Sequence, residues 1–240
     1  MEKGYRRYSH CGTRNDLTAR PHLIDGIPAG GYTGCMKRIV CFGDSNTWGY
    51  VPGAGLERYG EDVRWTGILQ KLLGERARIL EFGLCGCESG LKHRNKCFNA
   101  NAQELFPSVL FAHLPVDIVV LMLGTNDLKK ANDWQPGDTA RNIRALLAVT
   151  RTLSPATRTV LATPVLLRDG IESDAEFSRA AIAQSAQCAE EVAALARAEH
   201  IPLFDTNAAV HELGADGCHF TAAAHKAFAA GMAELLRGLV

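Results

Sequence analysis

From residue 36 onward, short apolar runs alternate with longer segments whose apolar residues recur at helical spacing. Unbroken apolar runs predict strands that are covered on both faces, and residues 117–123 form the strongest of them. Strands are predicted over residues 39–42, 77–82, 117–123, 157–163 and 202–205. Helices are predicted over residues 65–73, 101–114, 136–151, 174–199 and 221–239. Asp62 is expected to cap the first helix and Gly74 to end it. This alternation predicts one α/β domain, a three-layer α/β/α sandwich around a parallel sheet of five strands.

Residues 1–35 differ in character from the rest of the chain. They are rich in Arg, His, Gly and Pro, and they show neither a continuous apolar run nor helical periodicity. A secretory signal is therefore not predicted. Met36 stands directly before the first strand and could be the true start, which makes residues 1–35 a weakly structured extension and residues 36–240 a single domain. The alternative is an ordered arm that packs on a neighbouring subunit.

Composition and charge narrow the class of partner. The 240 residues are 47% apolar and 22% charged, and 26 basic residues balance 26 acidic ones. Nothing in this balance would attract nucleic acid or an anionic membrane, and no apolar run approaches the length of a membrane span. Eight cysteines without an export signal predict a reducing, cytoplasmic compartment and no disulfides. The expected partner is a small neutral molecule.

Three cysteines, Cys85, Cys87 and Cys97, lie close together in the sequence with His93 between them. The spacing resembles a metal site only loosely, because structural zinc sites show two well-spaced pairs of ligands. No metal or other cofactor is predicted. Cys85, Cys87 and Cys218 bracket the polar residues at the strand ends, and one hypothesis is that oxidation or metal capture there stops the chemistry. The favoured interpretation is that these are small residues filling space.

Polar residues gather where the predicted strands end. Ser45 follows the first strand, Gly86 the second and Asn126 the third, and residues 216–219 (Asp-Gly-Cys-His) precede the last helix. Because ligands of open α/β sheets bind beyond the carboxyl ends of the strands, we expect these residues to meet at one edge.

The residue types in these blocks fit nucleophilic catalysis. A serine hydroxyl is a poor nucleophile at neutral pH and needs a base, which His219 can supply. Asp216 could hold the imidazole in one tautomer and stabilise its charged form. The backbone amides of Ser45 and Gly86 and the side-chain amide of Asn126 are candidate donors to an oxyanion.

Each residue also has a structural interpretation. Taken alone, Ser45 is a turn or cap serine and Asn126 an Asx-turn residue. His225 competes with His219 but lacks a preceding Asp, so we interpret it as a solvated or packed helix residue. Asp127 is expected to shape its own loop.

The blocks together resemble those of the SGNH hydrolases, also called the GDSL esterase family. The resemblance covers residues 36–240 and rests on residues 43–49 (Gly-Asp-Ser-Asn-Thr-Trp-Gly), Gly86, residues 124–127 (Gly-Thr-Asn-Asp) and residues 216–219. Residues 62–67 (Asp-Val-Arg-Trp-Thr-Gly) and 220–221 are similar to the bacterial arylesterase and acyltransferase branch.

The resemblance implies a flavodoxin-like sheet, ester hydrolysis through an acyl-enzyme, no cofactor and frequent homo-oligomers. Matched by motif, Ser45 is the nucleophile, with Asp216 and His219 as its triad partners. Gly86 and Asn126 are oxyanion donors beside the amide of Ser45.

Departures from the family pattern bear on the substrate. The family often has Leu where this chain has Asn46, and the arylesterase branch tends to have Arg where this chain has Cys87. We expect substrate contacts from Asp44, Asn46, Trp48 and Cys87. The predicted activity is a serine esterase or acyltransferase acting on small, short-acyl or aryl esters. Alternatives are a carbohydrate acetylesterase, a lysophospholipase or a thioesterase on the same triad, and a catalytically silent ligand-binding module.

Overall fold

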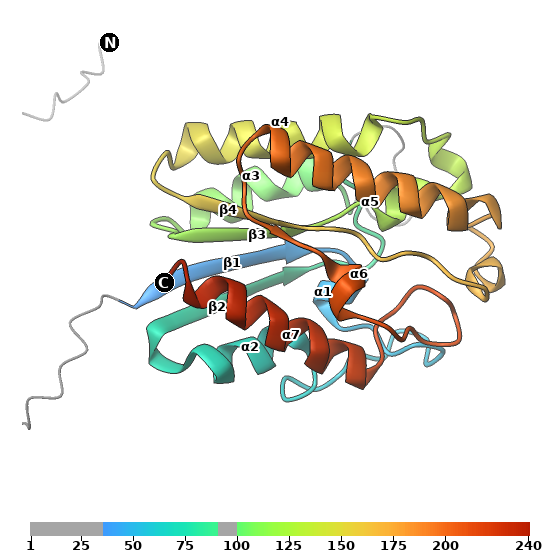
Figure 1. Cartoon of the computed structure of the whole chain (residues 1–240), viewed down its shortest axis with the longest axis horizontal. Coiled ribbons are helices and arrows are strands. Elements are labelled where there is room, and N and C mark those ends of the chain that lie inside the picture. The colour runs from blue at the N-terminus through green and yellow to red at the C-terminus, as the bar shows by residue number, and fades with distance from the viewer. Residues whose placement is uncertain (1–35, 91–99) are drawn as a thin grey trace, which may run out of the picture. The chain divides into compact units, whose positions relative to one another are not determined.

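The structure, a computed structural model, describes residues 36–90 and 100–240. The predicted extension over residues 1–35 lies outside the described residues. Five parallel strands form one sheet in the order β2-β1-β3-β4-β5 (Figure 1). The strands are β1 (Lys37–Gly43), β2 (Ala77–Gly83), β3 (Ile118–Met122), β4 (Arg158–Ala162) and β5 (Leu203–Phe204). This order is that of flavodoxin-like folds, and the predicted five-stranded parallel sheet is confirmed.

Helices cover both faces of the sheet, as the three-layer prediction requires (Figure 1). One layer contains α2 (Trp65–Leu73) and α7 (Ala222–Arg237), which pack on each other. The other contains α3 (Ala102–Ala112), α4 (Asp138–Leu153) and α5 (Ala180–Ala198). Two four-residue helices, α1 (Ser45–Trp48) and α6 (Thr206–Ala209), follow β1 and β5 directly. Single 3₁₀ turns are η1 (Gly74–Arg76), η2 (Thr125–Leu128), η3 (Lys130–Asn132) and η4 (Ile171–Ser173).

Alternation of side chains along the strands supplies both faces of the sheet with a core. In β1, Ile39 and Cys41 join the apolar cluster that includes α2 and α7. Val40 and Phe42 join the cluster that includes α3 and α4. All four are buried, and each large side chain contributes ~1.5–3 kcal/mol by leaving water. The strands are therefore held rigidly from both sides, and the residues just after them are held with them.

The cap of α2 and the start of α5 differ from the sequence predictions. The cap of α2 is Arg64, which makes no side-chain cap bond, and not Asp62. Helix α5 begins at Ala180, six residues later than predicted, because Asp174 organises a turn instead. The Asp174 side chain accepts a hydrogen bond from the Glu176 amide at 2.9 Å, and its carbonyl accepts one from the Phe177 amide. Residues 174–179 thus form a loop.

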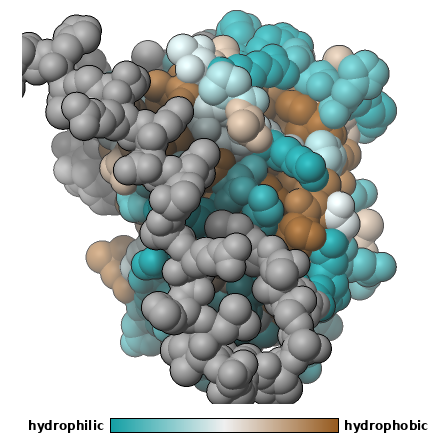
Figure 2. Space-filling model, turned by 90° about the vertical axis from the view of Figure 1, so that its left-hand side faces the viewer, coloured by the Kyte–Doolittle hydropathy of each residue, from teal (hydrophilic) through white to brown (hydrophobic). Residues whose placement is uncertain are grey.

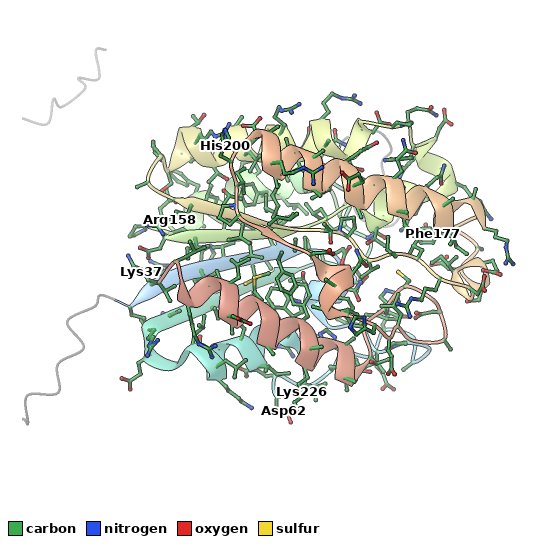
Figure 3. All side chains as sticks on the ribbon, in the orientation of Figure 1. Lys37, Asp62, Arg158, Phe177, His200 and Lys226 are labelled. Carbon is green, nitrogen blue, oxygen red and sulfur yellow. The ribbon has the colours of Figure 1, made fainter. Side chains whose placement is uncertain are left out.

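The two ends of the sheet can be followed by labelled residues. Lys37 and Arg158 mark the end where strands begin, and Phe177 lies at the opposite, carboxyl end (Figure 3). Seen from the side where the strands begin, hydrophilic and hydrophobic residues of the described chain are interspersed (Figure 2). Within residues 36–90 and 100–240, no helix combines the length and apolar composition needed to cross a membrane.

Candidate active site

Ser45 is the first residue of α1, directly beyond the carboxyl end of β1. The turn requires glycine at position 43, because a β-carbon there would lie 2.7 Å from the carbonyl oxygen of Met122 on the neighbouring strand. Asp44 caps α1 by accepting a 2.9 Å hydrogen bond from the amide of Asn46. The cap and the close strand contact fix Ser45 at the edge of the sheet, with its hydroxyl toward the last loop.

A hydrogen-bonded chain joins Ser45 to His219 and Asp216. The Oγ atom of Ser45 lies 2.9 Å from Nε2 of His219, and Nδ1 of His219 lies 2.9 Å from Oδ2 of Asp216. The other carboxylate oxygen of Asp216 accepts from the amides of Cys218 and His219 at 3.1 and 3.0 Å. The last loop is therefore folded around its own carboxylate, and the imidazole is oriented between acid and hydroxyl.

The pKa values of two carboxylates near the imidazole are shifted in opposite directions. Partial burial alone would raise the pKa of Asp216, but hydrogen bonds from His219 and attraction to it lower that pKa to about 2. Asp44 is 1% exposed, and burial raises its pKa to about 6, against the hydrogen bond from Asn46 and the attraction of His219. Asp216 therefore stays ionised at neutral pH and can stabilise a charged imidazole.

Three donors face the space beside Ser45. Gly86 adopts φ +75°, a left-handed conformation that favours glycine. Within the described residues, the backbone amides of Ser45 and Gly86 donate to no protein group. One N–H of the Asn126 side chain donates to the carbonyl of Cys87 at 3.2 Å, which orients the amide group and leaves its second N–H available. All three residues line the same cavity, so the arrangement can receive a negatively charged oxygen.

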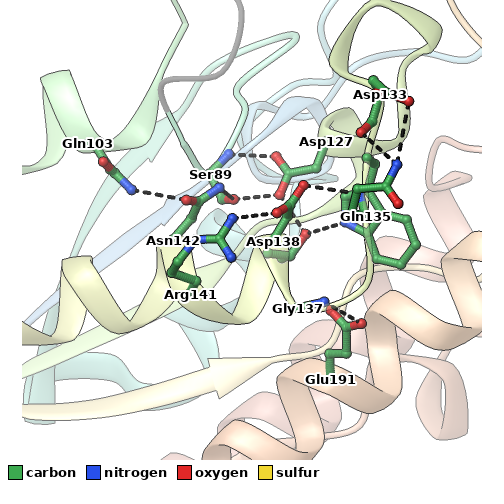
Figure 4. Close-up of polar contacts among 12 residues, drawn as sticks. Ser89, Gln103, Asp127, Asp133, Gln135, Gly137, Asp138, Arg141, Asn142 and Glu191 are labelled. Atoms are coloured by element: carbon green, nitrogen blue, oxygen red, sulfur yellow. Dashed lines mark hydrogen bonds and ion pairs between the residues drawn. The ribbon is translucent and has the colours of Figure 1, made fainter.

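Behind these donors, Asp127 holds the surrounding segments together (Figure 4). Its buried carboxylate accepts from the amide of Ser89 at 2.7 Å, from the hydroxyl of Ser89, and from the hydroxyl of Thr139 at 2.6 Å. Asn142 of α4 also donates to the Ser89 hydroxyl, at 3.2 Å. Asp127 does not line the Ser45 cavity. It joins the segment after β2 to η2 and α4, and so fixes the neighbourhood of Gly86 and Asn126.

The cavity at Ser45 has a volume of about 230 Å³, and most of its wall comes from residues outside the predicted triad and oxyanion donors. Tyr50 packs its ring 4.2 Å from the ring of His219. Cys85 and Cys218, which the sequence places around the site, line the cavity too, and the further lining residues are Lys129, Asp174, Glu176 and Phe177. Lys129 stands two residues after the Gly-Thr-Asn-Asp block, so proximity to a motif was the one signal that could have found it. The sequence predicts a helix from residue 174, and a helix start gives no sign that Asp174, Glu176 and Phe177 line a cavity.

The four residues expected to contact substrate lie elsewhere. None of Asp44, Asn46, Trp48 and Cys87 lines the cavity. Asp44 and Cys87 are buried, and Trp48 packs beside Tyr50 and under the guanidinium of Arg58. Trp48 and Cys87 therefore pack against neighbouring residues, and Asp44 caps helix α1.

Asn46 is turned toward the last loop and not toward the cavity. It is 2% exposed. Its Nδ2 donates to the carbonyl of Cys218 at 3.2 Å, and its Oδ1 accepts from the amide of Phe220 at 2.8 Å. These two bonds hold the chain immediately before and after His219. The polar residue that departs from the family pattern thus ties the serine helix to the histidine loop.

The cysteines near the site are protected thiols. Burial raises the pKa of Cys85 to about 11, and burial also raises the pKa values of Cys87 and Cys218. Little thiolate forms at neutral pH, which disfavours the proposed redox role. No group of three or more His, Cys, Asp or Glu among the described residues is arranged to hold a metal ion. His93 and Cys97, which entered the loose zinc pattern, lie outside the described residues.

His225 is a packed helix residue. Its ring is completely buried, its Nδ1 accepts from the amide of Trp65 at 3.2 Å, and it lies edge-on to the rings of Tyr59 and Phe220. Burial lowers the pKa of His225 to about 3. His225 therefore does not compete with His219 for the hydroxyl of Ser45.

Several solved structures of similar sequence are named as esterases. The chain is 33% identical to the native aryl esterase of M. Smegmatis, over 85% of this chain and 100% of that chain, with a TM-score of 0.78. It is 27% identical to Est24, a carbohydrate acetylesterase from Sinorhizobium meliloti, with the same coverage and a TM-score of 0.77. A putative arylesterase from Agrobacterium tumefaciens str. C58 is 26% identical over 85% of this chain and 100% of its own, with a TM-score of 0.76.

The family model for the GDSL-like lipase/acylhydrolase family matches residues 41–227. No curated protein is similar enough to the chain to count as a match. The matched range contains every block on which the resemblance to SGNH hydrolases rested, and that prediction is confirmed. With its fold, its motifs and its structural relatives in agreement, the chain belongs to the GDSL-like lipase/acylhydrolase family.

Proposed function

We propose that the chain is a serine esterase that hydrolyses small, short-acyl or aryl, carboxylic esters through an acyl-enzyme. The observation that carries the proposal is the Ser45–His219–Asp216 chain, with both of its side-chain hydrogen bonds at 2.9 Å. The arrangement opens on a cavity of about 230 Å³, a size that suits a small ester.

Acylation begins when Oγ of Ser45 attacks the ester carbonyl carbon and its proton passes to Nε2 of His219. Asp216, still ionised, stabilises the imidazolium through Nδ1. The carbonyl oxygen becomes an oxyanion and is stabilised by the amides of Ser45 and Gly86 and by the side chain of Asn126. The intermediate then collapses, the C–O bond to the leaving group breaks, and His219 returns the proton to the departing oxygen.

Deacylation repeats these steps with a second nucleophile. A water molecule gives a proton to His219 while its oxygen attacks the acyl carbon. The bond from the acyl carbon to Oγ of Ser45 then breaks, and His219 returns the proton to Oγ. An alcohol that competes with water at this step would receive the acyl group, which is the proposed acyltransferase activity. Ser45, His219 and Asp216 need no cofactor for either route.

A carbohydrate acetylesterase is the second candidate, and the cavity wall favours it. Lys129, Asp174 and Glu176 line the cavity with charged groups that can bond the hydroxyl groups of a sugar. Est24, among the similar structures, is named a carbohydrate acetylesterase. A lysophospholipase or a thioesterase is disfavoured, because a long acyl chain needs an apolar wall and this wall contains both polar and apolar residues.

A panel of esters tests both candidates. p-Nitrophenyl esters of increasing acyl length and acetylated sugars are given to the wild-type protein and to Ser45→Ala. We expect rates that fall with acyl length and that vanish in the variant. Wild-type rates in Ser45→Ala would overturn the proposal, and the ratio of sugar acetate to aryl acetate turnover separates the candidates.

A further inference from the structure

Lys129 is a nearly buried cation in the wall of the proposed active site. It is 7% exposed and lines the same cavity as Ser45 and His219. Its Nζ forms an ion pair with Oε2 of Glu176 at 2.7 Å. A lysine ammonium carries three N–H donors, and Glu176 is its one protein partner in residues 36–90 and 100–240. Buried donors without partners are costly. We therefore expect the two remaining N–H groups to bond to water or substrate in the cavity.

The ammonium group lies over an oxyanion donor. A β-carbon on Gly86 would stand 3.5 Å from Nζ of Lys129, and among the described residues no other atom outside its chain neighbours would lie within 4 Å. Since Gly86 has no side chain, the ammonium group can lie close to its backbone. The space that the amides of Ser45 and Gly86 face is therefore also within the field of Lys129.

We propose that Lys129 stabilises the negative charge of the tetrahedral intermediate, in addition to the three hydrogen-bond donors, and that Glu176 moderates this effect. The inference rests on the proposed function. The two charges of the pair act unequally, because the side chain of Lys129 is 8% exposed and that of Glu176 is 54% exposed. Water screens the charge of Glu176 more than that of Lys129, which leaves a net positive field beside Gly86.

A purely structural role is the alternative, since the ion pair also ties down the loop at Glu176. Lys130 supplies the same kind of anchor: its amide donates to the carbonyl of Glu176 at 2.8 Å and its Nζ to the carbonyl of Ala175 at 3.0 Å. Lys130 does not line the cavity. A variant at Lys130 therefore weakens the anchoring of this loop while leaving the charge beside Gly86 in place, and it is the matched control.

The experiment compares Lys129→Met, Lys129→Arg, Glu176→Gln and Lys130→Met in the full chain. Two quantities are measured at neutral pH: kcat and KM for p-nitrophenyl acetate, and the inhibition constant of phenylboronic acid, which forms a negatively charged tetrahedral adduct with an activated serine. For Lys129→Met we expect kcat to fall and the inhibition constant to rise by about tenfold each, less than the hundredfold or more of a direct oxyanion donor. KM should stay within about twofold, because the neutral ester does not carry the charge.

The two partners of the pair should act in opposite directions. Glu176→Gln removes the moderating charge, so it should raise kcat and tighten the boronic acid, while Lys130→Met should leave both unchanged. Lys129→Arg keeps the charge and should retain most of the activity, which separates loss of charge from misfolding.

Equal losses in Lys129→Met and Glu176→Gln that follow a lowered Tm would overturn the inference and favour loop anchoring. Unchanged kcat and boronic acid inhibition in Lys129→Met would also overturn it, and would leave the proposed function intact. If wild-type protein neither hydrolyses the ester nor reacts with a fluorophosphonate at Ser45, the proposed function fails and this inference fails with it.

Discussion

Replacing Asn46 with Leu removes the two bonds that hold the histidine loop against the serine helix. The carbonyl of Cys218 and the amide of Phe220 would each lose a partner, at residues that are 4% and 0% exposed. Leaving one buried polar group unpaired costs about 1–3 kcal/mol. Leu has the same branched outline as Asn and is not smaller, so the change creates no cavity. We expect the free energy of unfolding to fall by about 2–6 kcal/mol.

The same change should lower turnover more than stability alone explains. His219 lies between the two residues that Asn46 holds, and its Nε2 must stay at 2.9 Å from Oγ of Ser45 to take the proton. A displacement of about 1 Å at a reacting group can cost a hundredfold. We therefore expect kcat for p-nitrophenyl acetate to fall by about ten- to a hundredfold at a temperature where the variant is folded, with KM changing little.

Asn207 provides a control with the same bonding pattern away from the site. Its Nδ2 donates to the carbonyl of Pro164 at 3.0 Å and its Oδ1 accepts from the amide of Leu166 at 2.8 Å, so it also holds the residues on both sides of one position. Asn207→Leu should destabilise the fold in urea titrations followed by circular dichroism, yet leave kcat near wild type. Equal effects of the two variants on kcat, or wild-type kcat in Asn46→Leu, would refute a positioning role for Asn46.

Three further changes test other parts of the site and core. Asn126→Ala should lower kcat for p-nitrophenyl acetate by about a hundredfold or more with little change in KM, as expected for the loss of an oxyanion donor; a raised KM with unchanged kcat would contradict that role. Asp127→Asn removes one of the two oxygens that accept three hydrogen bonds, and urea unfolding should show a loss of about 1–3 kcal/mol; an unchanged midpoint would argue against the network. His225 has a folded-state pKa of about 3, below its ordinary value, so the unfolded chain binds the proton more readily and stability falls as the pH drops below about 6.5. Between pH 7 and pH 5 this loss should be about 2 kcal/mol, and His225→Gln, whose oxygen can still accept from the Trp65 amide, should lack that share of the loss in the same titration.

Features with a local cause could be predicted from the sequence. The runs in β1 and β3 are apolar on both faces because both faces are covered. The predicted strand over residues 117–123 is longer than β3 by one residue at each end. Ser45 and Asn126 lie just after strands, and His219 lies just before the last helix. Once the strands are parallel, these residues meet at the edge where the strands end, and the order of the strands brings them side by side.

Features with a distant cause could not be predicted. The partners of Asn46 are 172 and 174 residues away, and no pattern around Asn46 shows whether its amide faces a cavity or a loop. Residues 174–179 directly precede an alanine-rich helix and contain no Gly or Pro that would end it, but the bond from the Glu176 amide to Asp174 stabilises a turn there. The approach of Lys129 to Gly86 likewise arises only when η2 and the segment after β2 are packed together.

Activation of Ser45 by His219 can be measured by fluorophosphonate labelling followed by peptide mapping. We expect the wild-type protein to be labelled on Ser45 alone, Ser45→Ala not to be labelled, and His219→Ala to be labelled slower by orders of magnitude although it remains folded. A label on another residue, or the same labelling rate in His219→Ala as in wild type, would show that His219 does not activate Ser45.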